Sequence, residues 1–238
     1  MILYYVRHGD PVYDPDSLTP LGQRQAEAVA KRFAVYGLDK IYASTSNRAI
    51  LTAKPTCEVL KLEAELLDFA NEGHAWRELT VDLDEGRRTW LFHHKKTAEL
   101  FNSKEIRDLG DRWYEHPDLR AKNYGAGMER IYSGTDELLL SLGYEHERYT
   151  GKYRIVTPND RRVALFAHQG FGLAFLSALL DIPYPMISTH FDMCHTGITA
   201  IEFRNGGEYS IPRVLTLSSE AHIFKEGLPL KYNNGLRY

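Results

Sequence analysis

The chain has 238 residues, a length that fits one domain of ordinary size. Hydrophobic residues make up 43% and charged residues 26%, which provides for a sizeable core and a solvated surface and excludes a disordered or fibrous protein. The formal net charge of -3 gives no general basic field for nucleic acid or an anionic membrane, so any anion site must be built locally by a few arginines.

The two cysteines, Cys57 and Cys194, form no CxxC pair and are too few for a disulfide framework or a zinc cluster. The apolar run from Ile2 to Val6 is too short for a signal peptide, and no apolar run approaches the length of a membrane span. We therefore expect a cytoplasmic protein that binds neither nucleic acid nor membrane.

The first predicted elements are a strand and a helix. Residues 2–6 are apolar throughout, which is typical of a buried strand. The Pro/Asp-rich residues 10–16 are expected to be irregular. A helix then begins after Thr19 as its N-cap, with Pro20 in its first position, and Gly37 can end it with a positive φ.

Two further strand-to-helix units follow. Residues 40–43 predict a short strand, and a polar turn after it opens a helix that contains Arg48. Residues 163–167 predict a fully apolar strand that leads through His168 into another helix. Strands that alternate with helices indicate an α/β fold with a mostly parallel central sheet flanked by helices.

Two regions depart from this alternation. Residues 197–203 and 209–217 predict a hairpin around Asn205-Gly206-Gly207. Residues 73–150 hold all three tryptophans and include an apolar stripe at helical spacing from Met128 to Leu142, which predicts a core helix with Gly143 as its C-cap. We expect residues 73–150 to be an insert within a single domain, forming a cap over the active-site edge of the sheet.

Two histidines and two arginines lie where the predicted strands end. Arg7-His8-Gly9 and His168-Gln169-Gly170 each follow a strand, and Arg48 lies at the start of a helix, where backbone N–H groups favour an anion. Each has an ordinary explanation when taken alone: a chance tripeptide, a structural histidine, a surface ion-pair partner. Their joint placement at one rim of the sheet indicates an anion site.

Four motifs then occur in the order of a known family. They are Ile2–Gly9, Leu18–Ala26, Ala43–Ala49 followed by Thr52-Ala53, and Ala167–Gly170. Together they resemble the histidine phosphatase superfamily, which has the phosphoglycerate-mutase-like fold. The combination is specific for fold and reaction type and poorly specific for substrate.

The resemblance implies a phosphatase in which His8 attacks phosphorus and becomes a phosphohistidine. It also implies that Arg7, Arg48, His168 and Gln169 bind the phosphoryl group. A neutral imidazole is a good nucleophile near neutral pH, and arginines can clamp phosphoryl oxygens with forked donors. With that much fixed positive charge we expect no metal and no cofactor, and a small phosphorylated molecule as substrate.

A departing alkoxide needs a proton, so a carboxylic acid must lie beside the pocket. Glu72 is our candidate, because the family's acid follows the second arginine at about this distance. The residues after Glu72 depart from the pattern of many relatives. Glu78 is therefore the next candidate and Glu65 a poorer one.

Other charged residues of the insert admit more than one interpretation. The adjacent His93-His94 could suggest a metal, but neighbouring residues point to different sides of a regular element, so a site is disfavoured. Arg87-Arg88 and Lys95-Lys96 are most simply solvated charges. They could instead bind a second acidic group on the substrate.

Two alternatives to a phosphatase remain open. A phosphoglycerate-type mutase is disfavoured because Asp10, Pro11, Asp14 and Pro15 depart from the family mutases' pattern after Arg-His-Gly, and Arg87-Arg88 is the only candidate for their paired arginines. A catalytically impaired phospholigand-binding protein is disfavoured because both histidines and both arginines are present. The sequence leaves the natural substrate and the oligomeric state undetermined.

Overall fold

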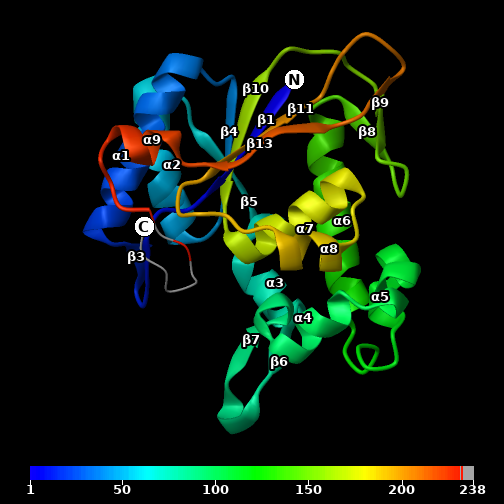
Figure 1. Ribbon diagram of the computed structural model, residues 1–238. Coiled ribbons are helices and arrows are strands. Elements are labelled where there is room, and N and C mark those ends of the chain that lie inside the picture. The colour runs from blue at the N-terminus through cyan, green and yellow to red at the C-terminus, as the bar shows by residue number, and fades with distance from the viewer. Residues whose placement is uncertain (231, 233–238) are drawn as a thin grey trace.

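The computed structural model describes residues 1–230 and 232, apart from the side chain of Glu85. Its centre is a six-stranded sheet in the order β13-β11-β1-β10-β4-β5 (Figure 1). The strands are β1 (Ile2–Arg7), β4 (Lys40–Ser44), β5 (Ala64–Leu67), β10 (Arg162–Ala167), β11 (Ile198–Glu202) and β13 (Arg213–Ser219). Strands β1, β10, β4 and β5 are parallel, and β11 and β13 run antiparallel to their neighbours. The predicted α/β fold with a mostly parallel sheet is confirmed.

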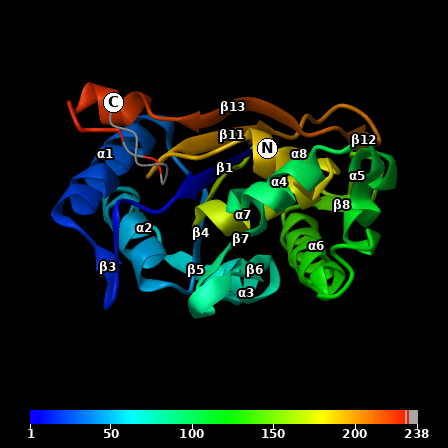
Figure 2. The same ribbon diagram turned by 60° about the horizontal axis from the view of Figure 1, so that its bottom comes forward.

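Helices cover both faces of this sheet (Figures 1 and 2). On one face lie α1 (Pro20–Tyr36), α2 (Asn47–Leu60) and α9 (Ala221–Lys225); on the other lie α6 (Tyr124–Ser141), α7 (Gln169–Leu180) and α8 (Tyr184–His190). Because successive side chains of a strand point to opposite faces, β10 serves both cores. Leu165 packs in the core with α6 and α7, and Phe166 packs with Val29 and Phe33 of α1.

The start of α1 confirms the predicted cap and fixes the loop after β1. The Thr19 hydroxyl accepts a hydrogen bond from the Gly22 N–H at 3.1 Å, and Gly37 ends the helix with a φ of 72°. The first turn of α1 lies directly against the chain after His8. A Cβ on Gly9 would come within 2.7 Å of the Gly22 carbonyl oxygen, and a Cβ on Gly22 would overlap the carbonyl of Asp10.

This close approach predicts that Gly22→Ala destabilises the protein. The added methyl would force the Asp10 backbone away from α1, and we expect the free energy of unfolding in urea to fall by about 1–3 kcal/mol, the usual cost of overpacking. Gly207→Ala is the control, since its nearest neighbour would be 3.8 Å from the new Cβ. Equal stability of the two variants would show that the contact between loop and helix is not rigid.

Two predictions of secondary structure are wrong, one for residues 10–16 and one for residues 209–217. Residues 10–16 are not irregular, because β2 (Pro11–Tyr13) and β3 (Asp16–Leu18) pair as a small hairpin; its prolines lie at the start of β2 and in the turn, where no strand N–H is lost. Residues 209–217 are not one strand. The segment is divided before Pro212, which cannot donate a ladder hydrogen bond, into β12 (Tyr209–Ser210) and β13.

Strand β12 belongs to a second, three-stranded sheet with β9 (Lys152–Ile155) and β8 (Tyr144–Glu147). The predicted antiparallel pairing with β11 is made by β13, but Asn205-Gly206-Gly207 is not its turn, because this segment leads into β12.

Residues 72–141 supply α3 (Glu72–Glu78), β6 (Thr80–Asp82), β7 (Arg88–Trp90), α4 (Lys95–Phe101), α5 (Lys104–Leu109) and then α6. The β6–β7 hairpin projects from the rest of the molecule (Figure 1). Helix α6 buries the predicted apolar stripe, and Gly143 follows it with a φ of 97°. Among the described residues, no helix combines the length and the apolar character that crossing a membrane requires.

Candidate active site

His8 lies at the carboxyl end of β1 with its imidazole almost completely buried. Its Nδ1 is 2.7 Å from the carbonyl oxygen of Gly9. Because a carbonyl can only accept, Nδ1 must carry the proton, which leaves the lone pair of Nε2 free. Burial lowers the pKa of His8 well below its usual value, and His168, Arg7 and Arg48 lower it further. His8 is therefore a neutral imidazole near pH 7, fixed in the tautomer that a nucleophile requires.

Arg7 is fully buried beside His8. Its guanidinium donates to the Met193 carbonyl and, over 2.9 Å, to Nε2 of His195. Burial lowers the pKa of Arg7, and in the part of the chain that the structure describes no carboxylate lies within ion-pair distance of it. A buried cation without a paired carboxylate is costly unless an anion joins it.

Arg48 and Glu72 form an ion pair across the site. Helix α2 carries Arg48, whose Nη2 is 3.0 Å from Oε2 of Glu72 and whose Nη1 is 2.9 Å from Asp16 on β3. Glu72 begins α3, where Asn71 is the N-cap and accepts from the Gly73 N–H. The second oxygen of Glu72 accepts from the Gly170 N–H at the start of α7, at 3.0 Å.

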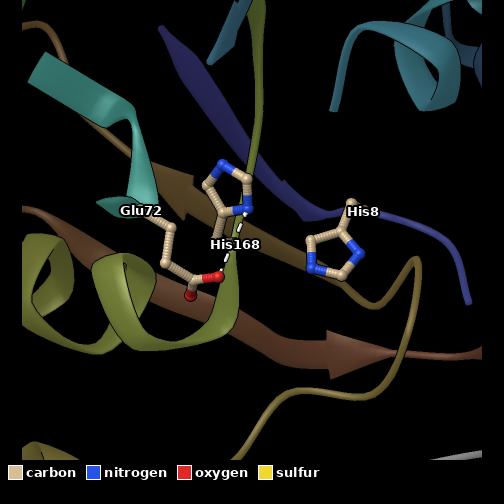
Figure 3. Close-up of side chains that lie close together, drawn as sticks. All are labelled: His8, Glu72 and His168. Carbon is tan, nitrogen blue, oxygen red and sulfur yellow. Dashed lines mark ion pairs between the residues drawn. The ribbon is translucent and has the colours of Figure 1, made fainter. Parts of the chain in front are cut away.

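His168 completes the group at the end of β10 (Figure 3). Its Nε2 is 2.8 Å from the hydroxyl of Ser44, and its Nδ1 is buried without a hydrogen-bond partner, 3.6 Å from Glu72 Oε2. Burial lowers the pKa of His168 well below its usual value, and Arg48 and Arg7 add to the effect, so this imidazole is neutral as well. The unsatisfied Nδ1 lies on the side of the ring that faces Glu72 and His8, and the ring centres of His168 and His8 are 5.3 Å apart (Figure 3).

The other predicted carboxylates are engaged elsewhere. Glu78 binds Arg130 of α6 through several contacts of 2.6–3.0 Å, and Glu65 pairs with Lys40 at 2.6 Å. Of the three candidates for the acid, only Glu72 lies beside His8 and His168 in this geometry. Gln169 is buried, and its amide donates to Asp192.

The site also has the composition of a possible metal centre. One donor atom each from His8, Glu72 and His168 lies within 4.8 Å of the other two. Two imidazoles and a carboxylate can form a three-ligand zinc site. However, Arg7 and Arg48 border the same space, and the field that lowers the pKa of both histidines also opposes a bound cation.

The His93-His94 pair does not join this group. His94 makes a hydrogen bond of 2.8 Å to the Thr97 hydroxyl at the start of α4, and the group of metal-ligand type found among the described residues contains neither histidine.

His195 is a residue of the site that the sequence analysis missed. Its ring centre is 5.8 Å from that of His8, and its Nδ1 is 3.5 Å from Asp10. It precedes β11, which is antiparallel to β1, so the start of β11 meets the end of β1 at the same edge. The sequence does show a histidine just before a predicted strand. That histidine can be placed in the site only when the strand is known to run antiparallel to β1.

A cleft of about 670 Å³ opens beside this group of residues. Arg48 and Glu72 lie at its boundary with the site, and the remaining lining comes from β2 and β3, the start of α2, α3 and β7. These further lining residues are Tyr13, Asp16, Thr45, Ser46, Asn47, Asn71, Gly73, Trp76 and Trp90. A substrate whose phosphoryl group reached His8 could place its leaving group in this cleft.

Comparison with known proteins identifies the family. Residues 3–132, more than half of the chain, match the model of the histidine phosphatase superfamily (branch 1), and the chain belongs to that superfamily. The resemblance seen in the sequence is thereby confirmed. A search of curated proteins gave no significant match.

Solved structures share the fold over nearly the whole chain. A mycobacterial glucosyl-3-phosphoglycerate phosphatase is 22% identical, with 92% of this chain and 98% of that one covered and a TM-score of 0.58. A phosphoserine phosphatase mutant from Entamoeba histolytica, in complex with phosphoserine, is 19% identical, with 93% and 98% covered and a TM-score of 0.59. These likenesses establish the fold.

Proposed function

We propose that this protein hydrolyses phosphomonoesters through a phosphohistidine on His8. The observation that carries the proposal is the fixed tautomer of His8, whose Nε2 lone pair is free in a pocket bordered by Arg7, Arg48 and His168. Membership of the histidine phosphatase superfamily supports the same chemistry.

In the first step, Nε2 of His8 attacks phosphorus and the bond from phosphorus to the ester oxygen breaks. Glu72, in its protonated form, gives its proton to the departing oxygen. The phosphorylated imidazole becomes cationic, and the Gly9 carbonyl that accepts from Nδ1–H stabilises it. Arg7 and Arg48 balance the negative charge of the phosphoryl oxygens with their guanidinium groups.

In the second step, a water molecule attacks the phosphorus of phosphohistidine and gives a proton to the Glu72 carboxylate. The bond from nitrogen to phosphorus breaks, inorganic phosphate leaves, and both side chains return to their first state. His168 supports both steps, because its unsatisfied Nδ1 can donate to a phosphoryl oxygen while the Ser44 hydroxyl donates to Nε2. The phosphoryl group also gives Arg48 a partner that competes with Glu72, which would free the carboxyl for proton transfer.

The cleft favours a phosphatase over a mutase. Arg87 and Arg88, the candidates for a mutase's paired arginines, are exposed near the tip of the β6–β7 hairpin, and Arg88 pairs with Asp82 at 2.8 Å. Neither lines the cleft. Gly73, Trp76 and Trp90, all from residues 73–150, do line it, which supports the proposal that this insert caps the active site.

The reaction is proposed to need no metal, because the two arginines already supply the positive charge. Hydrolysis of nitrophenyl phosphate should continue undiminished after dialysis against a chelator. Orthovanadate should inhibit it, since five-coordinate vanadium imitates phosphorus during transfer. Loss of activity in chelator with recovery on adding zinc would contradict the proposal and assign His8, Glu72 and His168 to a metal.

A further inference from the structure

The described lining of the cleft contains two acidic residues and one basic residue. Arg48 is the one cationic residue of the described cleft lining, and its two terminal nitrogens bind Asp16 and Glu72. In the first step the phosphoryl group engages Arg48 and Glu72 is protonated, so Asp16 is the charged residue of the described lining that a leaving group then meets.

Two further cations, Arg77 and Arg130, lie near the cleft and have partners of their own. Arg77 donates to Nδ1 of His74 at 2.6 Å, and His74 in turn lies 3.0 Å from Asp68. Arg130, on α6, is bound to Glu78. A carboxylate on the substrate would therefore meet Asp16, while Arg77, the exposed cation beside Gly73, is linked through His74 to Asp68. Like charges repel, so Asp16 disfavours an acidic leaving group.

Three aromatic rings lie in the cleft lining, beside uncharged polar residues such as Asn47 and Asn71. Trp76 of α3 is 36% exposed and stands nearly perpendicular to Trp90, with 5.0 Å between ring centres. Trp90 stacks on Phe92 at 5.8 Å and presses on Gly170, whose N–H binds Glu72. Trp90 is thus fixed close to the proposed acid, and it supports Trp76 at the open side of the cleft.

The third aromatic ring of the cleft lining belongs to β2. Tyr13 of β2 is 63% exposed and lies 5.5 Å from the Arg48 guanidinium. The Tyr13 ring is thereby engaged with Arg48, and the indole of Trp76 is the flat apolar face open to solvent that a ligand ring can contact.

Resting on the phosphatase function proposed above, we propose that the preferred substrates are phosphomonoesters whose leaving alcohol carries an uncharged flat ring. Trp76 is the residue that selects the ring, and the carboxylate of Asp16 selects against acidic leaving groups. Small amino-acid and hydroxy-acid phosphates are accordingly poor substrates.

The test compares kcat/KM for four alkyl phosphates: benzyl, ethyl, para-carbamoylbenzyl and para-carboxybenzyl phosphate. The last two differ in one charge on the same ring, so the demand for acid catalysis is closely matched. We expect wild type to prefer the carbamoyl over the carboxy ester by about tenfold, as expected for a like charge in a partly screened cleft.

Trp76→Leu should reduce the preference for benzyl over ethyl phosphate by about threefold to tenfold, the usual worth of an aromatic pair. Trp76→Phe should keep most of that preference. Phe224→Leu, an exposed aromatic on α9 outside the cleft, is the control and should leave the ratio unchanged.

Equal or better turnover of the carboxy ester, or an unaltered benzyl preference in Trp76→Leu, would overturn this inference while the enzyme remained a phosphatase. Failure to hydrolyse any of the four esters, or hydrolysis that survives in His8→Ala, would instead overturn the proposed function.

Discussion

Replacement of His8 by alanine is expected to lower kcat/KM for every phosphomonoester by at least about 10⁴-fold, because the variant has no nucleophile to form the covalent intermediate. The effect should not depend on the leaving group, since the bond from His8 to phosphorus cannot form with any ester. Steady-state phosphate release on nitrophenyl phosphate and benzyl phosphate measures it.

His190→Ala is the matched control. His190 lies at the end of α8, where its side chain is exposed and its Nε2 contacts Asn102 at 2.8 Å. It should retain wild-type activity. Residual activity of the His8 variant within a few-fold of wild type, with the fold intact by circular dichroism, would mean that another group attacks phosphorus.

Glu72→Gln is expected to have the second largest effect, and here the leaving group should matter. The amide keeps the size of the side chain but cannot supply a proton, so turnover of an alkyl phosphate such as benzyl phosphate should fall by about 10²–10⁴-fold. Nitrophenyl phosphate should suffer much less, because the nitrophenolate ion leaves without protonation.

Glu78→Gln provides the comparison on the same helix. That variant loses the pairing of α3 with Arg130 of α6 but no group beside His8, so its effects on the two esters should be small and alike. If Glu78→Gln showed the larger dependence on the leaving group, the acid would be reassigned. Small and equal effects in both variants would place the acid outside α3.

The parallel part of the fold could be predicted from the sequence because local signals suffice for it. The apolar strands β1 and β10 are each followed directly by a histidine, and the cap at Thr19 fixes where α1 begins. Carboxyl ends of parallel strands meet at one edge of a sheet. The order and direction of the strands were therefore enough to predict that His8, Arg48 and His168 lie close together.

The remainder depends on contacts between distant segments. Nothing near His195 shows that β11 runs antiparallel to β1, and nothing near Asp16 shows that it pairs with Arg48. The residues that line the cleft could not be predicted from the sequence either, since Trp76 and Trp90 meet only because α3 and the β6–β7 hairpin fold against α7. Polar stretches such as residues 10–16 also admit either a loop or a short hairpin until their neighbours are known.

The most direct measurement of the central claim is to trap the phosphoenzyme. The protein is mixed with radiolabelled phosphomonoester, quenched in alkali or in acid, and digested for mass spectrometry. We expect the label to survive alkali, to be lost in acid as phosphohistidine requires, and to map to Nε2 of His8. A label that is stable in acid, maps to another residue, or forms in His8→Ala would contradict the mechanism.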